Sequence, residues 1–174
     1  MNSLILLSRA IDRLSQFIGR GLRWVVLLLV VLGVINVLGR YIGARLGVQL
    51  SSNSLLEGQI QAFNLIFLLG AAYLLAENGH IRVDVLHGQL GALKKAWVEL
   101  LGSILLLIPF CLVMIWYSID YVSRAWQRLE VSPNPGGLPL YPIKTVIIIG
   151  FVLLLLQAVS QAIKAAAVIR EVPR

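Results

Sequence analysis

The chain has 174 residues, of which 59% are hydrophobic and only 13% are charged, and its mean hydropathy is +0.87. Soluble domains carry about 25% charged residues, so this composition excludes a soluble globular protein. The net charge of +7 does not indicate nucleic-acid binding, because Lys and Arg stand at the ends of apolar blocks and form no concentrated patch.

Four apolar segments are long enough to cross a membrane as helices. A bilayer core about 30 Å thick requires roughly 20 residues of helix. We therefore expect one domain, residues 1–174, folded as an all-α bundle of four transmembrane helices at about 22–41, 55–76, 97–117 and 143–163. The first segment follows four arginines, as in a signal peptide, but it is too long and no cleavage site follows it, so we expect a retained anchor.

The basic residues next to the spans predict the orientation. Ten lie on the side of the two termini and of the loop after the second span, against five on the other side. Both termini are therefore expected in the cytoplasm, with the chain in the inner membrane of a bacterial or archaeal cell. The expected lipid-interface anchors are the basic and aromatic residues near the span ends: Arg23, Trp24, Lys94, Lys95, Trp97, Trp116, Tyr117 and Trp126.

Two local features modify this four-span pattern. Between the second and third spans, apolar residues recur at helical spacing over about 81–94, which favours a short amphipathic helix in the inner interface over a plain cytoplasmic loop. Pro109, near the middle of the third span, removes one backbone hydrogen bond and is expected to bend that helix.

Polar side chains form stripes on the outer halves of the first two spans. Glu57, Gln61 and Asn64 share one face of the second span, and Asn36 and Arg40 share one face of the first. Because both stripes fall in the same leaflet, we expect Arg40 to pair with Glu57 and to hold the two helices in register. These five residues are candidates for contacts within the bundle or with a partner.

A further polar stripe lies at the inner end of the fourth span. Gln157, Ser160, Gln161 and Lys164 follow one another on one helix face. This face is expected to meet either another protein or the interior of the bundle, and Gln157 and Gln161 are its interface candidates.

The sequence contains no pattern typical of a catalytic or cofactor site. Its two histidines, His80 and His87, both lie outside the spans, which argues against haem, and its single cysteine, Cys111, lies inside an apolar block. Known hydrolase and nucleotide-binding motifs are missing from the sequence. We therefore expect no cofactor and no enzymatic activity.

The strongest local signal follows the second span. The stretch contains Glu77, Gly79, His80, Ile81, Arg82, Val83 and Asp84. It closely resembles the signature of the small, DctQ-like membrane subunit of tripartite ATP-independent periplasmic (TRAP) transporters. Glu57 and the Pro139–Tyr141–Pro142 entry to the fourth span add to this resemblance, which covers roughly residues 20–165.

The resemblance implies a three-part importer of small carboxylates. A periplasmic solute-binding protein would capture the solute, and a large DctM-like membrane subunit would move it inward with sodium, which is expected to bind that partner and not this chain. The small subunit would brace the large one and help to dock the binding protein. The sequence does not identify the acid that is carried.

Alternatives remain for the motif and for the function. The motif residues either fix a turn at the interface, where Arg82 reaches lipid phosphate and Asp84 caps a helix, or contact the large subunit directly. The competing functions are a self-sufficient dimeric transporter that uses Glu57 for coupling and a haem-free membrane anchor of a redox enzyme.

Overall fold

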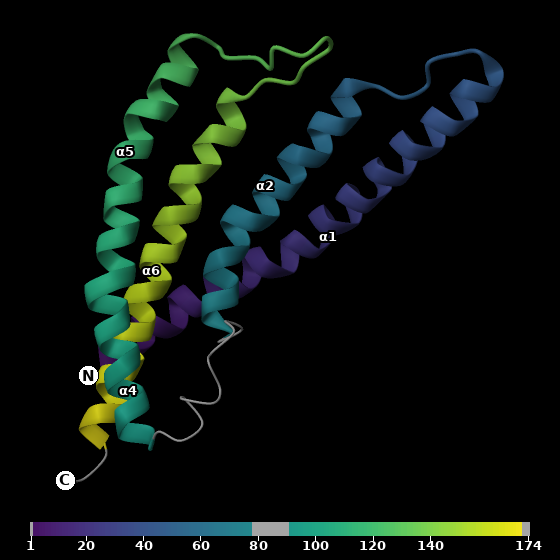
Figure 1. The fold of residues 1–174 in the computed structure, drawn as a ribbon. Helices are drawn as coiled ribbons and strands as arrows, with labels where there is room; N and C mark the ends of the chain where they lie inside the picture. The colour runs from purple at the N-terminus through teal and green to yellow at the C-terminus, as the bar shows by residue number, and fades with distance from the viewer. Residues whose placement is uncertain (1, 78–90, 172–174) are drawn as a thin grey trace.

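The computed structural model describes residues 2–77 and 91–171. Over these residues the regular structure is helical, with one isolated antiparallel bridge between Val131 and Pro139. In chain order the elements are α1 (Asn2–Leu46), α2 (Asn53–Ala76), α4 (Ala92–Leu101), the π-helix η1 (Gly102–Leu107), α5 (Ile108–Gln127) and α6 (Tyr141–Glu171) (Figure 1).

Four of the helical stretches are long and apolar enough to cross a membrane, as the sequence predicts. They run over Ser3–Leu46, Asn53–Ala76, Leu93–Gln127 and Tyr141–Arg170. The second begins within two residues of the predicted start, where Ser52 caps α2 by accepting a hydrogen bond from the Leu55 N–H. The other three extend beyond the predicted spans, because helical structure continues where the side chains become polar.

The helices pack in two antiparallel pairs. α1 packs against α2 and α5 against α6, and α6 also contacts α1, α2 and α4. Figure 1 shows the two pairs diverging toward the end that carries the connections 47–52 and 128–140 and meeting at the end that carries both termini. At that closed end α1 crosses α6, so α6 is the element that joins the two pairs.

Two glycines allow the close approach of neighbouring helices. A Cβ atom at Gly150 of α6 would lie 2.8 Å from the carbonyl oxygen of Leu68 in α2, and one at Gly19 of α1 would lie 2.3 Å from the ring of Tyr73. Small residues of this kind let helix backbones pack in a membrane, where lipid leaves little hydrophobic drive for association.

The third membrane helix contains a π-helical turn directly before Pro109. In η1 the bond pattern shifts by one residue, so that the Ile108 N–H donates to the Ser103 carbonyl. Proline cannot donate a backbone hydrogen bond, and in a regular α-helix its ring clashes with the carbonyl four residues earlier. The wider π turn makes room for the ring. The sequence predicts a bend at Pro109; the feature that the structure describes there is this π turn, and the bend itself stays a prediction.

The predicted interfacial helix at 81–94 lies mostly outside the described residues. Only its last residues are described, and they belong to the start of α4, which runs through η1 into α5.

Candidate functional site

Glu57 is the centre of a polar contact between α2 and the connection 128–140. One carboxylate oxygen accepts hydrogen bonds from the Ser132 hydroxyl and, at 2.9 Å, from the Asn134 amide. The other accepts the Leu138 N–H at 2.6 Å. Glu57 is only 6% exposed, and we call these four residues the Glu57 cluster.

The same face of α2 holds the rest of this connection through backbone carbonyls. Asn53 donates to the carbonyl of Pro135 at 3.4 Å, Ser54 to that of Gly136, and Gln61 to that of Pro139 at 3.0 Å. The predicted stripe on α2 consists of Glu57, Gln61 and Asn64. The first two bind the connection, and Asn64 is half-buried. The stripe therefore clamps a loop onto a helix end.

The expected Arg40–Glu57 pair is wrong. Within the described residues the contacts of Glu57 all come from the 132–138 segment, and Arg40 is exposed on α1. Arg40 instead lines a pocket of about 350 Å³ together with Asn36, whose side chain is buried and whose Oδ1 has no hydrogen-bond partner among the described groups. Helix periodicity identified both faces correctly but not which neighbour each one meets.

The connection is also fixed where it leaves α5 and enters α6. Lys144 forms an ion pair with Glu130 at 2.5 Å and lies 4.2 Å from the centre of the Tyr121 ring. Trp126 donates a 2.8 Å hydrogen bond to Thr145. Trp126 was predicted as a lipid-interface anchor, and the structure shows that its indole also links α5 to α6.

A second polar cluster joins α1 to α6 at the closed end of the bundle. The Asp12 carboxylate accepts hydrogen bonds from Gln157 and Ser160, both at 2.9 Å, and forms an ion pair with Lys164 at 2.5 Å. Ser15 donates to Gln157 at 2.9 Å, and the hydroxyls of Ser8 and Ser160 lie 2.8 Å apart. These residues form the Asp12 cluster: Ser8, Asp12, Ser15, Gln157, Ser160 and Lys164.

Most of the Asp12 cluster is buried between α1 and α6, whereas the side chains of Asp12 and Lys164 are 19% and 46% exposed. Ser8, Ser15, Gln157 and Ser160 are each at most 2% exposed. An acid that is even partly buried is costly unless it is paired and hydrogen-bonded, and here each oxygen of the half-buried Asp12 has a partner. The polar stripe predicted on the fourth span thus meets the interior of the bundle through Gln157.

The α1 half of this cluster was missed by the sequence analysis. Ser8, Asp12 and Ser15 are spaced by four and three residues and so share one helix face, the same signal that identified the stripe on α6. These residues precede the apolar block that defines the predicted span, so the span itself does not include them. Their packing depends on α1 remaining helical from Asn2 onward.

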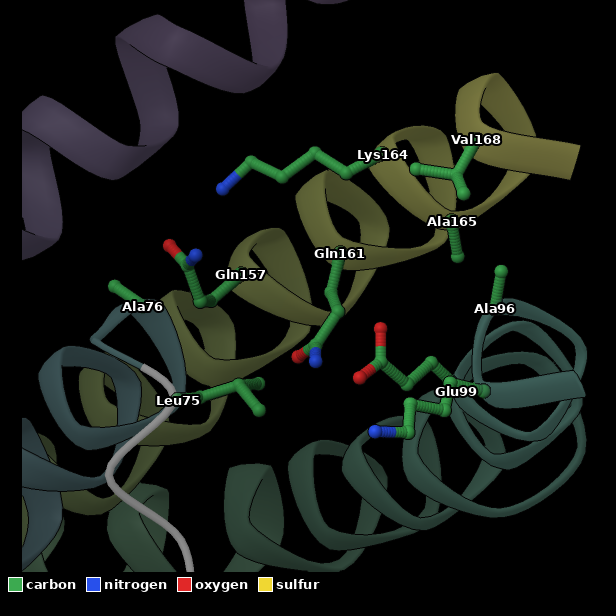
Figure 2. Close-up of a pocket in the computed structure, with 10 residues that line it drawn as sticks. Leu75, Ala76, Ala96, Glu99, Gln157, Gln161, Lys164, Ala165 and Val168 are labelled. Atoms are coloured by element: carbon green, nitrogen blue, oxygen red, sulfur yellow. The ribbon is translucent and has the colours of Figure 1, made fainter. Parts of the chain in front are cut away.

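Gln161, the other interface candidate on α6, lines a pocket of about 320 Å³ between α2, α4 and α6, which Gln157 and Lys164 of the Asp12 cluster also line. Figure 2 shows its side chain pointing toward Glu99 of α4, whereas Lys164 extends toward α1. The Oε1 atom of Gln161 is buried without a hydrogen-bond partner among the described groups. Lys95, a predicted lipid anchor, also lines this pocket.

Of the signature at the end of the second span, the structure describes Glu77, which accepts a 3.0 Å hydrogen bond from Gln16 of α1. The other signature residues, Gly79, His80, Ile81, Arg82, Val83 and Asp84, lie outside the described residues. Of the remaining predicted anchors, Arg23, Trp24, Lys94, Trp97, Trp116 and Tyr117 are exposed. Large exposed aromatic side chains on helices of this length are typical of a lipid-facing surface.

Comparison with protein families assigns the chain to a family. The family model described as "Tripartite ATP-independent periplasmic transporters, DctQ component" matches residues 29–168, which contain α2, α4, η1, α5 and most of α6. The chain belongs to the DctQ family. No curated protein and no solved structure matches it.

Membership of the DctQ family gives the two clusters a context. This chain is the small membrane subunit of a TRAP transporter, a multi-pass component of a transport system and of a kind that is generally not an enzyme. The matched region includes Glu57 and Gln157 but begins after the α1 half of the Asp12 cluster. In this DctQ chain both clusters join parts of the chain to one another.

Proposed function

We propose that this DctQ subunit is a non-catalytic scaffold in the inner membrane, with both termini in the cytoplasm. It would brace the large DctM-like membrane subunit of a sodium-driven importer of small carboxylates. Sodium and solute would bind to the partners, and the end of the bundle formed by the Glu57 cluster would help to dock the periplasmic solute-binding protein.

The observation that carries this proposal is that the acidic groups Asp12 and Glu57 serve as hydrogen-bond acceptors inside the chain. Both carboxylates are engaged by hydrogen bonds from groups of this same chain. A residue that couples transport to an ion must release and rebind its partners during the cycle. Glu57, the coupling residue of the rival dimeric-transporter hypothesis, instead holds the 132–138 segment on α2 through three donors.

The outer surface of the bundle supports the same proposal. Phe67 of α2 is 68% exposed, and Trp116 and Tyr117 of α5 are 76% and 74% exposed. Apolar surface of this extent on membrane-spanning helices suits contact with lipid and with the apolar helices of a larger membrane protein.

Reconstitution into liposomes separates the scaffold from a self-sufficient transporter. Liposomes would contain this chain alone, the large subunit with the binding protein, or all three proteins, and would be given an inward sodium gradient and a radiolabelled carboxylate. We expect accumulation only when all three are present. Accumulation by this chain alone would refute the scaffold role, and full uptake without it would show that no scaffold is needed.

A further inference from the structure

Four arginines line one face of the first half of α1. Arg9, Arg13, Arg20 and Arg23 are all exposed, and their spacings of four, seven and three residues return to the same side of a helix. We call them the basic face. It lies beside, and not within, the face on which Asp12 meets α6.

The opposite side of the same helical segment is apolar and uncovered by the rest of the chain. At about 100° per residue, Leu7 and Leu14 fall opposite the basic face, and they are 51% and 42% exposed. Phe17 and Trp24 lie between the two sides and are 69% and 74% exposed. A basic face with exposed Leu residues opposite it and exposed Phe and Trp residues beside it is the pattern of a helix that lies in a membrane interface.

The length and packing of α1 place this segment at the interface. A helix of 45 residues is about 68 Å long, more than twice the roughly 30 Å of a bilayer core. The Asp12 cluster holds the first turns of α1 beside Gln157–Lys164 of α6, so they do not project away from the bundle. In Figure 1 the beginning of α1 accordingly lies at the closed end, near α4.

We propose that the basic face binds anionic phospholipids in the leaflet at the closed end of the bundle, while Phe17 and Trp24 insert into the hydrocarbon beside it. Arg20, Arg23 and Trp24 line, with Leu27, a surface pocket of about 450 Å³ that offers two guanidinium groups next to apolar surface. This combination suits a phosphate group with its attached glycerol and acyl chain. The inference is independent of the scaffold role, because it concerns only this chain and lipid.

The first test measures lipid binding by the full chain. The chain would be reconstituted in nanodiscs of phosphatidylcholine containing increasing phosphatidylglycerol, and retention of phosphatidylglycerol would be quantified by native mass spectrometry. Each surface arginine contributes about 1 kcal/mol of attraction to an anionic leaflet, so Arg13→Gln with Arg20→Gln should weaken retention about thirtyfold. The matched control, Arg124→Gln with Arg128→Gln, removes the same charge from exposed positions at the other end and should have little effect.

The second test measures how deeply the first half of α1 lies in the membrane, and it leaves the arginines in place. In a Cys111→Ala background, a spin label at Phe17→Cys should be accessible to oxygen in the hydrocarbon. A spin label at Gln16→Cys, next to the basic face, should instead be accessible to an aqueous nickel complex. Equal access of both labels to the aqueous reagent would overturn the proposal. So would equal loss of phosphatidylglycerol in the test and control variants, or loss of copurification with the large subunit while lipid retention is unchanged.

Discussion

Gln157 is the residue whose replacement tests the packing of this protein most directly. It is 1% exposed and bridges two residues of α1, accepting from Ser15 and donating to Asp12, both at 2.9 Å. Gln157→Leu keeps the approximate volume but removes both hydrogen bonds. Interhelical hydrogen bonds in membranes contribute about 0.6 to 1.7 kcal/mol, and a bond to an ionised acceptor contributes about 1.5 to 3 kcal/mol. We therefore expect a loss of about 2 to 3 kcal/mol in the free energy of unfolding.

The assay is reversible unfolding in mixed micelles with increasing SDS, followed by circular dichroism. Gln59→Leu is the matched control, because its amide donates to the Leu55 carbonyl of its own helix and should matter by less than about 1 kcal/mol. A double-mutant cycle with Ser15→Ala should give a coupling energy of about 1 kcal/mol. Equal stability of Gln157→Leu and the wild-type chain, or no coupling to Ser15, would refute the role assigned to this cluster.

Three other substitutions test the remaining contacts. Glu57→Gln replaces one acceptor oxygen by a donor, so it should weaken copurification with the large subunit or lower thermal stability, while the solute preference of the transporter stays the same. An altered solute preference with intact assembly would contradict this structural role of Glu57. Gly150→Ala pushes a methyl group against the Leu68 carbonyl and should lower the free energy of unfolding by about 1 to 3 kcal/mol in the SDS assay. Its control, Gly21→Ala, meets no atom within 4 Å and should be neutral or stabilising. The opposite order of stabilities would show that α2 and α6 do not pack closely. Pro109→Ala should allow the preceding π turn to become α-helical, which would change the distance between spin labels on α4 and α5. An unchanged distance would show that the turn does not depend on the proline.

The structural role of the connection 128–140 could be foreseen only in part. Its prolines and glycines predict the end of α5, and the helix ends at Gln127. Gly136, with φ of +72°, helps to shape the turn that brings the Leu138 N–H to Glu57. No local pattern states that a carboxylate 81 residues earlier will accept that bond.

The sequence by itself determined the four membrane helices, the polar faces and, through the stretch that begins at Glu77, the resemblance to the DctQ family. These features depend on composition and on periodicity within one helix, which the chain carries locally. The tertiary structure alone decided which faces meet. In the structure Glu57 contacts the 132–138 segment and not Arg40. Gln157 contacts Asp12, a residue outside the predicted spans. The physical reason is that periodicity specifies the direction of a side chain from its own helix axis, whereas its partner depends on how far each helix extends and where it crosses the others.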